Sequence, residues 1–86
     1  MKDLCLNNPQ LYNLIRAEHE RQLAKWGVQD HSPFEWLAFT LEELGEMSDA
    51  ISEWHFRRGN PQDVVKEAIE TATLALKIAE MFGAMK

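Results

Sequence analysis

The three prolines of this 86-residue chain each follow a polar residue that can cap a helix. They occur as Asn8-Pro9, Ser32-Pro33 and Asn60-Pro61. Asn and Ser side chains accept hydrogen bonds from the free N–H groups of a first helical turn, and proline suits the first helical position because its missing N–H is not needed there. Glu35 stands three residues after Ser32 and completes a capping box. A helix is therefore predicted to begin at each of these three points.

Glycines mark where these helices are expected to end, because glycine adopts the left-handed conformation that commonly follows a helix. With Gly27, Gly59 and Gly83 as stops, the predicted helices cover about residues 9–26, 33–58 and 61–82. No segment shows the alternation of a strand, and there is no repeat. The short connection at Gly59-Asn60 makes the last two helices antiparallel neighbours. We predict one all-α domain over residues 1–86, a small antiparallel bundle of three main helices.

The hydrophobic content is high for a chain of this length, at 45% with three Trp and four Phe. A domain of this size buries only about 60–65% of the surface that its unfolded chain exposes, so a monomer would be marginally stable. We therefore expect a homo-oligomer, a dimer or a tetramer, that completes the core between subunits.

The net charge of −5 argues against a nucleic-acid polymer as partner. An acidic protein can still bind a phosphorylated small molecule when metal cations mediate the contact. A single cysteine, Cys5, excludes an intramolecular disulfide framework. No apolar run approaches about 18 residues and the N-terminus lacks a signal-peptide pattern, so we expect a cytoplasmic protein without membrane contact.

On a helical wheel, the acids of residues 33–58 fall into two groups. Glu43 lies at the margin of an apolar stripe, and Glu46 lies one step further round, beside Phe39 and Ala50. Three other acids cluster on the far side and are expected in solvent. The stripe comprises Leu37, Leu41, Leu44, Met47, Ile51 and Trp54; the solvated acids are Glu42, Asp49 and Glu53.

The helix at residues 61–82 carries a second pair, Glu67 and Glu70. The pair lies off the main apolar stripe, but the same face continues into other apolar side chains and is expected to be buried. The stripe comprises Val65, Ile69, Ala72, Leu76 and Ala79; the continuing face carries Leu74, Ile78 and Met81. Two acids on an otherwise apolar face need a reason, because an unpaired buried carboxylate is costly.

The i, i+3 spacing places each glutamate pair on one helical face, and antiparallel packing can bring the two pairs opposite each other. Four adjacent carboxylates repel one another and raise their own pKa values unless a cation neutralises them. Oxygen ligands without Cys or His favour Mg²⁺ or Mn²⁺, which points to phosphate-ester or phosphate-anhydride chemistry. On spacing alone, a Glu-xx-Glu pair is usually a solvated helix face; the apolar surroundings and the second pair are what favour a metal site.

The stretch from Glu42 to Glu46, followed by Glu67 and Glu70, resembles the MazG-like all-α nucleotide pyrophosphohydrolases. The signature of that family is a Glu-xx-Glu pair on one helix and a Glu-xx-Asp pair on the next. The preceding segment 25–33 also looks like the loop before the family's first metal helix. The resemblance covers roughly residues 16–82.

The resemblance implies a Mg²⁺-dependent enzyme, a helical dimer or tetramer, that hydrolyses a nucleoside triphosphate to monophosphate and pyrophosphate, as in nucleotide-pool house-cleaning. By position, Glu43, Glu46, Glu67 and Glu70 would be the metal ligands and catalytic carboxylates, one of which would orient the attacking water. Glu70 departs from the usual Asp: it keeps the charge but reaches about one methylene further, which puts the metal geometry and the level of activity in question.

Six further residues are candidates for binding the nucleotide. His31 and Trp54 match family positions around the base, although a helix-capping histidine and a core or interface tryptophan are equally good interpretations. Trp26 and Gln29 are weaker candidates. Arg21 and Lys25 lie four apart and either face the triphosphate or pair with Glu18 or Glu20 on a solvated face.

Two other functions remain open. A non-catalytic helical oligomer, acting as an interaction module, would pair its acids with Arg21, Lys25 or Lys77 across subunits. A nucleotide sensor would keep the metal site and lack turnover, with Glu70 as the lesion. Metal titration and a turnover assay distinguish the three.

Overall fold

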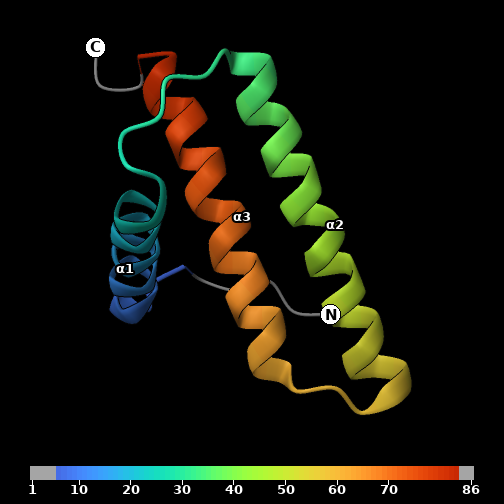
Figure 1. Ribbon diagram of the computed structural model, residues 1–86. Coiled ribbons are helices and arrows are strands. Elements are labelled where there is room, and N and C mark those ends of the chain that lie inside the picture. The colour runs from blue at the N-terminus through green and yellow to red at the C-terminus, as the bar shows by residue number, and fades with distance from the viewer. Residues whose placement is uncertain (1–5, 84–86) are drawn as a thin grey trace.

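The computed structural model describes residues 6–83 of the chain, and these form three α-helices without a strand among them. The helices are α1 (Pro9–Trp26), α2 (Pro33–Arg57) and α3 (Pro61–Met81), shown in Figure 1. The predicted all-α class and the three helical segments are confirmed to within one residue. None of the helices over residues 6–83 is long and apolar enough to cross a membrane. Cys5, the single cysteine from which a disulfide framework was excluded, lies outside the described residues.

Each helix begins at its predicted cap. The Asn8 and Asn60 side chains accept hydrogen bonds from the N–H groups of Gln10 and Gln62, at 3.0 and 2.9 Å. At α2 the capping box is complete: Glu35 N–H donates to Ser32 Oγ at 3.2 Å, and Ser32 N–H donates to Glu35 Oε1 at 2.9 Å. These local bonds satisfy donors that a helix leaves free, which explains why the sequence predicts the starts so closely.

The end of α2 differs from the prediction by one residue. After α1, Gly27 has a positive φ of 71°, but its ψ of −168° is not that of the predicted left-handed conformation; after α2 the left-handed residue is Arg58, at φ 58° and ψ 35°. Gly59 is needed for a different reason: its N–H donates to the Glu53 carbonyl at 2.9 Å, and a Cβ at this position would lie 3.0 Å from the Glu53 carbonyl carbon. Gly59 therefore permits a close backbone approach rather than a left-handed turn.

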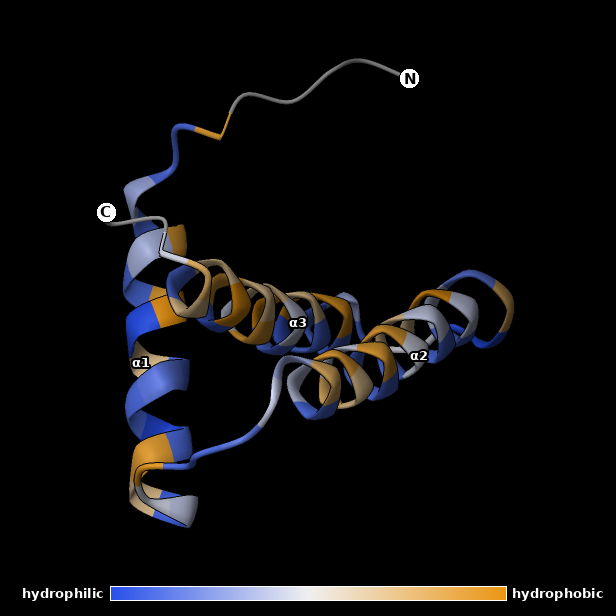
Figure 2. Ribbon diagram, turned by 90° about the horizontal axis from the view of Figure 1, so that it is seen from above, coloured by the Kyte–Doolittle hydropathy of each residue, from blue (hydrophilic) through white to orange (hydrophobic). Residues whose placement is uncertain are grey.

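The helix α3 is the centre of the fold. It runs antiparallel to α2 and also contacts α1, whereas α1 and α2 do not pack against each other within residues 6–83. Seen from above, α1 lies beside α3, on the side away from α2, and runs at a steep angle to it (Figure 2). The antiparallel arrangement thus holds for α2 and α3, and α1 crosses α3 alone.

The contact of α1 with the rest of the fold is largely polar. Its two buried residues are Glu18 and Gln22, while Leu14 and Trp26 are 43% and 50% exposed. Polar side chains therefore form the buried part of this helix, and Trp26 is not a core residue. Figure 2 shows hydrophilic colouring over most of α1.

The inner face of α2 is the face that carries Glu43, not the leucine-rich stripe. Trp36 is buried and Phe39, Glu43, Met47 and Ala50 are partly buried, which places this face toward α3. The predicted stripe is otherwise exposed: Leu37, Leu41, Leu44, Ile51 and Trp54 are between 45% and 57% accessible. On α3, Leu76 is likewise 52% exposed. A wheel identifies an apolar stripe but cannot tell which of two adjacent faces meets the neighbouring helix.

Candidate metal centre

Four glutamates from two helices meet where α2 and α3 face each other. Glu43 and Glu46 of α2 and Glu67 and Glu70 of α3 each offer a carboxylate oxygen within 4.8 Å of the others. The i, i+3 spacing brings each pair to one face, and the antiparallel packing of α2 and α3 brings the two faces together. The predicted juxtaposition of the two pairs is thus present in the fold. We call these four residues the carboxylate cluster.

The cluster is electrostatically strained without a cation. Burial, together with the neighbouring carboxyls of Glu70 and Glu46, raises the pKa of Glu43 from 4.5 to about 8. The pKa of Glu67 is raised for the same reasons, burial first and then repulsion from Glu70 and Glu46. A carboxyl with its pKa near 8 holds its proton at neutral pH, so the cluster carries less than four negative charges until something positive enters it.

Two oxygens of the cluster also lack a hydrogen-bond partner. Glu43 Oε2 and Glu67 Oε2 are both inaccessible to solvent and accept no bond from any residue that the structure describes. A buried polar atom without a partner is costly, and native structures rarely keep one without a use. Carboxylate oxygens from two facing helices are the donor type that Mg²⁺ or Mn²⁺ takes. The residues present therefore fit a hard divalent cation.

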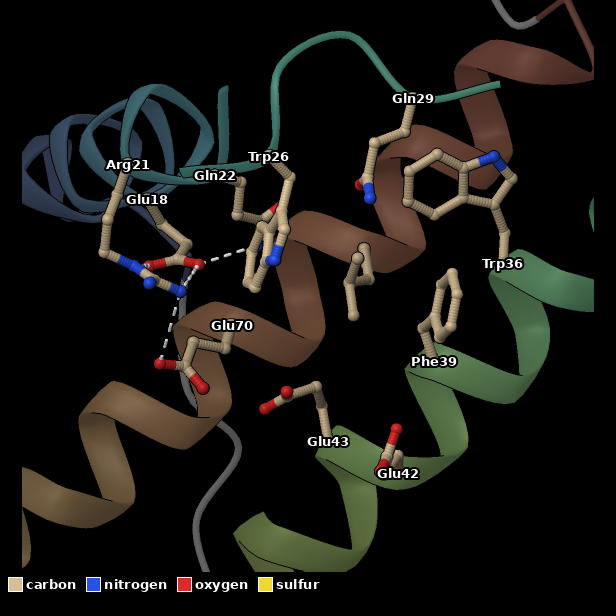
Figure 3. A pocket seen from close by; sticks show the side chains of 11 residues that line it. Glu18, Arg21, Gln22, Trp26, Gln29, Trp36, Phe39, Glu42, Glu43 and Glu70 are labelled. Carbon is tan, nitrogen blue, oxygen red and sulfur yellow. Dashed lines mark hydrogen bonds and ion pairs between the residues drawn. The ribbon is translucent and has the colours of Figure 1, made fainter. Parts of the chain in front are cut away.

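A cleft of about 310 Å³ opens beside the cluster, between all three helices (Figure 3). Glu43 and Glu70 form its acidic wall. Three aromatic rings, Trp26, Trp36 and Phe39, line another part of it. The remaining lining residues are Glu18, Arg21, Gln22, Gln29, Glu42 and Leu74. Acidic, aromatic and cationic groups thus converge on one cavity.

Arg21 is the cation nearest to the cluster. Its Nε and Nη2 donate to the two oxygens of Glu18, both at 2.8 Å, and Nη2 lies 3.9 Å from Glu70 Oε1. Figure 3 shows the guanidinium between these two carboxylates. The predicted pairing of Arg21 with Glu18 is thus present, and Arg21 also lines the cleft; its approach to a triphosphate stays a prediction.

The other predicted binding residues divide between the cleft and its surroundings. Trp26 and Gln29 line the cleft, whereas Lys25 lies over the Trp26 ring, 4.7 Å from its centroid. Trp54 does not line it, since eight residues of helix, about 12 Å, separate Trp54 from Glu46.

His31 stands behind the aromatic wall rather than in the cleft. Its ring packs edge-on against Trp36 and Phe39, with centroids 5.1 Å apart in each case. Its Nδ1 lies 3.6 Å from Glu35, and its Nε2 is buried without a partner among the described residues. His31 therefore fixes the position of the two rings that line the cleft.

The sequence analysis missed Trp36, Phe39, Glu18 and Gln22 as site residues. Trp36 had a readable signal, because it lies seven residues before Glu43 and so on the same helical face, two turns away. Glu18 and Gln22 had no such signal: their contact with α3 depends on the steep crossing of α1, which no local pattern specifies. Glu42 was expected in solvent; it is exposed but lies at the rim of the cleft.

Comparison with protein families, with characterised proteins and with solved structures finds no significant match to this chain.

Proposed function

We propose that the chain is a Mg²⁺-dependent, MazG-like nucleotide pyrophosphohydrolase that converts a nucleoside triphosphate to its monophosphate and pyrophosphate. The observation that carries the proposal is that Glu43 and Glu67, on two facing helices, each keep a buried oxygen without a partner among the described residues, within a cluster whose carboxylates come within 4.8 Å of one another. They belong to the four-carboxylate pattern that the sequence shares with that family. The adjoining cleft supplies groups suited to a base and to phosphates.

Glu43, Glu46, Glu67 and Glu70 would hold the cation, with Mn²⁺ able to replace Mg²⁺. When bound, the cation neutralises charge on the phosphate oxygens and activates water. Glu70 in place of the usual Asp lies closest to Arg21, and its longer side chain is compatible with a place in the cluster, since its oxygen is among those that meet within 4.8 Å.

The cleft residues would bind the rest of the nucleotide. Trp26 and Trp36 offer ring faces or edges for the base, and stacking on an aromatic side chain is worth about 1–3 kcal/mol per base. The Gln29 amide can donate to and accept from base edges. Arg21 presents a planar guanidinium suited to a phosphate. Lys25 and His31 would support the nucleotide site indirectly. Lys25 lies over the Trp26 ring and His31 packs against Trp36, so each would hold its tryptophan in position.

In the reaction, an oxygen of water bonds to the α-phosphorus and the bond from that phosphorus to the α–β bridging oxygen breaks. Pyrophosphate leaves with the bonding electron pair, and a cluster carboxylate orients the attacking water and takes up its proton.

A purely structural role for the cluster finds less support. The cations expected to pair with it in an interaction module are engaged elsewhere: Lys77 donates to Gln22 and lies over the Trp36 ring, and Lys25 lies over Trp26. Only Arg21, at 3.9 Å from Glu70, approaches the cluster within residues 6–83. One cation beside four carboxylates does not neutralise them.

The test is release of pyrophosphate from a panel of common and modified nucleoside triphosphates with Mg²⁺ or Mn²⁺. In ¹⁸O-labelled water the label should appear in the monophosphate, as attack at the α-phosphorus requires. Glu46→Gln and Glu67→Gln should abolish the release while leaving the helical circular dichroism intact. Asp49→Asn is the matched control, because it removes one exposed carboxylate three residues from Glu46. Retained activity in both Gln variants refutes the proposal, whereas tight nucleotide binding without turnover supports the sensor.

The proposal includes a homo-oligomer. The accessible surface is 7111 Å², whereas a compact protein of 10.0 kDa exposes about 5,200 Å². In a symmetric dimer, an excess of about 1,900 Å² on each chain would amount to about 3,800 Å² in total, which lies in the range of about 2,000–5,000 Å² that obligate interfaces bury. The leucine stripe on α2 is the natural contact, because Leu37, Leu41 and Leu44 form an apolar row that is about half exposed.

Sedimentation velocity tests the oligomer. We expect a dimer or a tetramer at micromolar concentration, and Leu41→Lys should shift it to a monomer by placing charges in the interface. Tyr12→Lys, which changes a 70% exposed residue on α1, should leave the assembly unchanged. A wild-type monomer at 100 µM, a concentration chosen as about a hundredfold above a micromolar dissociation constant, refutes this part alone.

A further inference from the structure

We propose that Glu18 is a positioning residue that holds Arg21 away from the carboxylate cluster and so keeps the cluster open to a divalent cation. This inference deepens the proposed function and rests on it. Glu18 lies on α1, outside the four-carboxylate pattern, and no motif in the sequence marks it. Its role follows from the observation that the Arg21 guanidinium is hydrogen-bonded to Glu18 and not to Glu70.

The guanidinium has two carboxylates within reach and binds one of them. Both oxygens of Glu18 accept from Arg21 at 2.8 Å, which is the bidentate geometry of a strong charge-assisted pair. The nearest cluster oxygen, Oε1 of Glu70, lies 3.9 Å away, beyond hydrogen-bond distance. The same Nη2 group takes part in both approaches, so a small movement would transfer Arg21 from Glu18 to Glu70.

Glu18 is itself held in place from two sides. The Gln22 amide donates to Glu18 Oε2 at 2.6 Å, and the amide oxygen of Gln22 accepts from Lys77 on α3. Glu18 and Gln22 are 8% and 6% exposed, so this chain of contacts is largely withdrawn from solvent. The pair Glu18–Arg21 is thus tied to the helix that carries Glu67 and Glu70, which fixes its distance from the cluster.

The cluster also attracts Arg21, although less than Glu18 does. The pKa of Arg21 is raised, chiefly by its hydrogen bond to Glu18 against a smaller effect of burial, and also by attraction to Glu18, Glu70 and Glu43. Once freed from Glu18, the guanidinium would therefore move toward the cluster. There it would compete with a divalent cation for the same oxygens, because two positive groups bound side by side repel each other.

The proposal predicts opposite effects for the two members of the pair. Glu18→Gln should weaken Mg²⁺ binding by about three- to tenfold, because Arg21 is released onto the cluster; Arg21→Gln should tighten it by a similar factor, because a half-exposed positive charge is removed beside it. The double variant should bind Mg²⁺ like Arg21→Gln alone. Gln22→Leu should act in the same direction as Glu18→Gln and less strongly.

The experiment is calorimetric titration of the metal-free full chain with MgCl₂ in the absence of nucleotide, with helical content and melting temperature recorded for every variant. Arg16→Gln is the matched control, since it removes a positive charge from α1 at a residue that does not line the cleft, and it should leave the affinity within about twofold.

The outcomes separate the two proposals. If the wild-type chain binds no Mg²⁺, the proposed metal site fails and this inference fails with it. If the wild type binds Mg²⁺ and the double variant is as weak as Glu18→Gln, Glu18 has a structural role only and this inference alone is overturned. An Arg21→Gln affinity equal to or weaker than the wild type overturns it as well, even where Glu18→Gln does not fold. Equal tightening by Arg16→Gln would reduce the effect to net charge and also overturn it.

Discussion

Glu18 and Glu43 are both acids withdrawn from solvent at the same cleft, yet their surroundings are opposite. Every oxygen of Glu18 is bonded: Arg21 donates to both, and Gln22 donates to one of them. One oxygen of Glu43 has no partner, and its neighbours are other carboxyls. Burial by itself acts to raise the pKa of each carboxyl. At Glu18 the hydrogen bonds from Arg21 and Gln22 outweigh burial, so its pKa is lowered. At Glu43 the neighbouring carboxyls add to the effect of burial, so its pKa is raised.

The difference shows that burial alone does not distinguish a structural acid from a functional one. A buried carboxylate whose oxygens are all hydrogen-bonded is already stabilised, so binding a cation would add little. A buried carboxylate with an unpartnered oxygen beside other acids has a free energy cost that a cation can remove. The same residue type on neighbouring helices therefore serves two purposes, and each can be tested by taking its charge away.

The largest expected effect is that of the metal on stability. At a hundredfold excess over its dissociation constant, Mg²⁺ should raise the free energy of unfolding by about 2.7 kcal/mol. For a chain of this size that corresponds to an increase in melting temperature of about 10–20 °C. Glu43→Gln should lose most of the increase, since it removes a ligand and its charge. Differential scanning fluorimetry with EDTA and with MgCl₂ measures both.

The comparison predicts that Glu18→Gln behaves differently from Glu43→Gln in this assay. Glu18→Gln should keep a Mg²⁺-induced increase, displaced to higher metal concentration, whereas Glu43→Gln should show little increase at any concentration. Asp49→Asn should match the wild type. A wild-type melting temperature that Mg²⁺ leaves unchanged would contradict the assignment of Glu43 to a metal site and, with it, the functional contrast with Glu18.

Much of this fold could be predicted from the sequence because its information is local. Helix starts depend on a cap and a proline within a few residues, and the i, i+3 spacing of two glutamate pairs on antiparallel helices is enough to bring them together. The inner face of α2 was harder to predict, because the wheel offers both the leucine stripe and the face of Glu43. Only the packing against α3 decides between them.

The burial of Glu18 and its link through Gln22 to Lys77 could not be predicted, for a different physical reason, although the pair of Glu18 with Arg21 is among the predicted alternatives. Glu18 and Arg21 look like an ordinary i, i+3 pair on a solvated helix, and such pairs are common. What buries Glu18 is the crossing of α1 over α3, together with Gln22 and Lys77, which are 55 residues apart in sequence. Contacts between distant residues of this kind leave no periodic pattern to read.

A smaller effect is expected from pH in the absence of metal. Glu43 has a pKa of about 8 in the folded chain and an ordinary value of 4.5 when unfolded, so between these values the folded state holds a proton that the unfolded state has lost. The stability that this proton provides is complete below pH 4.5 and is lost as the pH rises through 8. Glu67, with a raised pKa, contributes in the same direction.

Urea unfolding in EDTA at fixed protein concentration, from pH 5 to pH 9, measures this slope. The wild type should lose stability across the range, and Glu43→Gln should flatten the profile because glutamine cannot ionise. Saturating Mg²⁺ should also flatten it. A wild-type profile that is flat or rising in EDTA would contradict the crowding of ionisable carboxyls in the cluster.

The smallest expected effect is on the acid side, where Glu18 should act with the opposite sign. Its pKa lies below 4.5 in the folded chain, so the stability that it contributes is present above pH 4.5 and is lost as the pH falls through the folded pKa. The deficit of Glu18→Gln relative to wild type should therefore shrink toward pH 3 and be constant above pH 6. The exposed side of Arg21 keeps this difference modest, because solvent screens the pair. A deficit that is equal at pH 3 and pH 7 would mean that packing of the Glu18 side chain, and not its ionised pairing with Arg21, is what α1 needs.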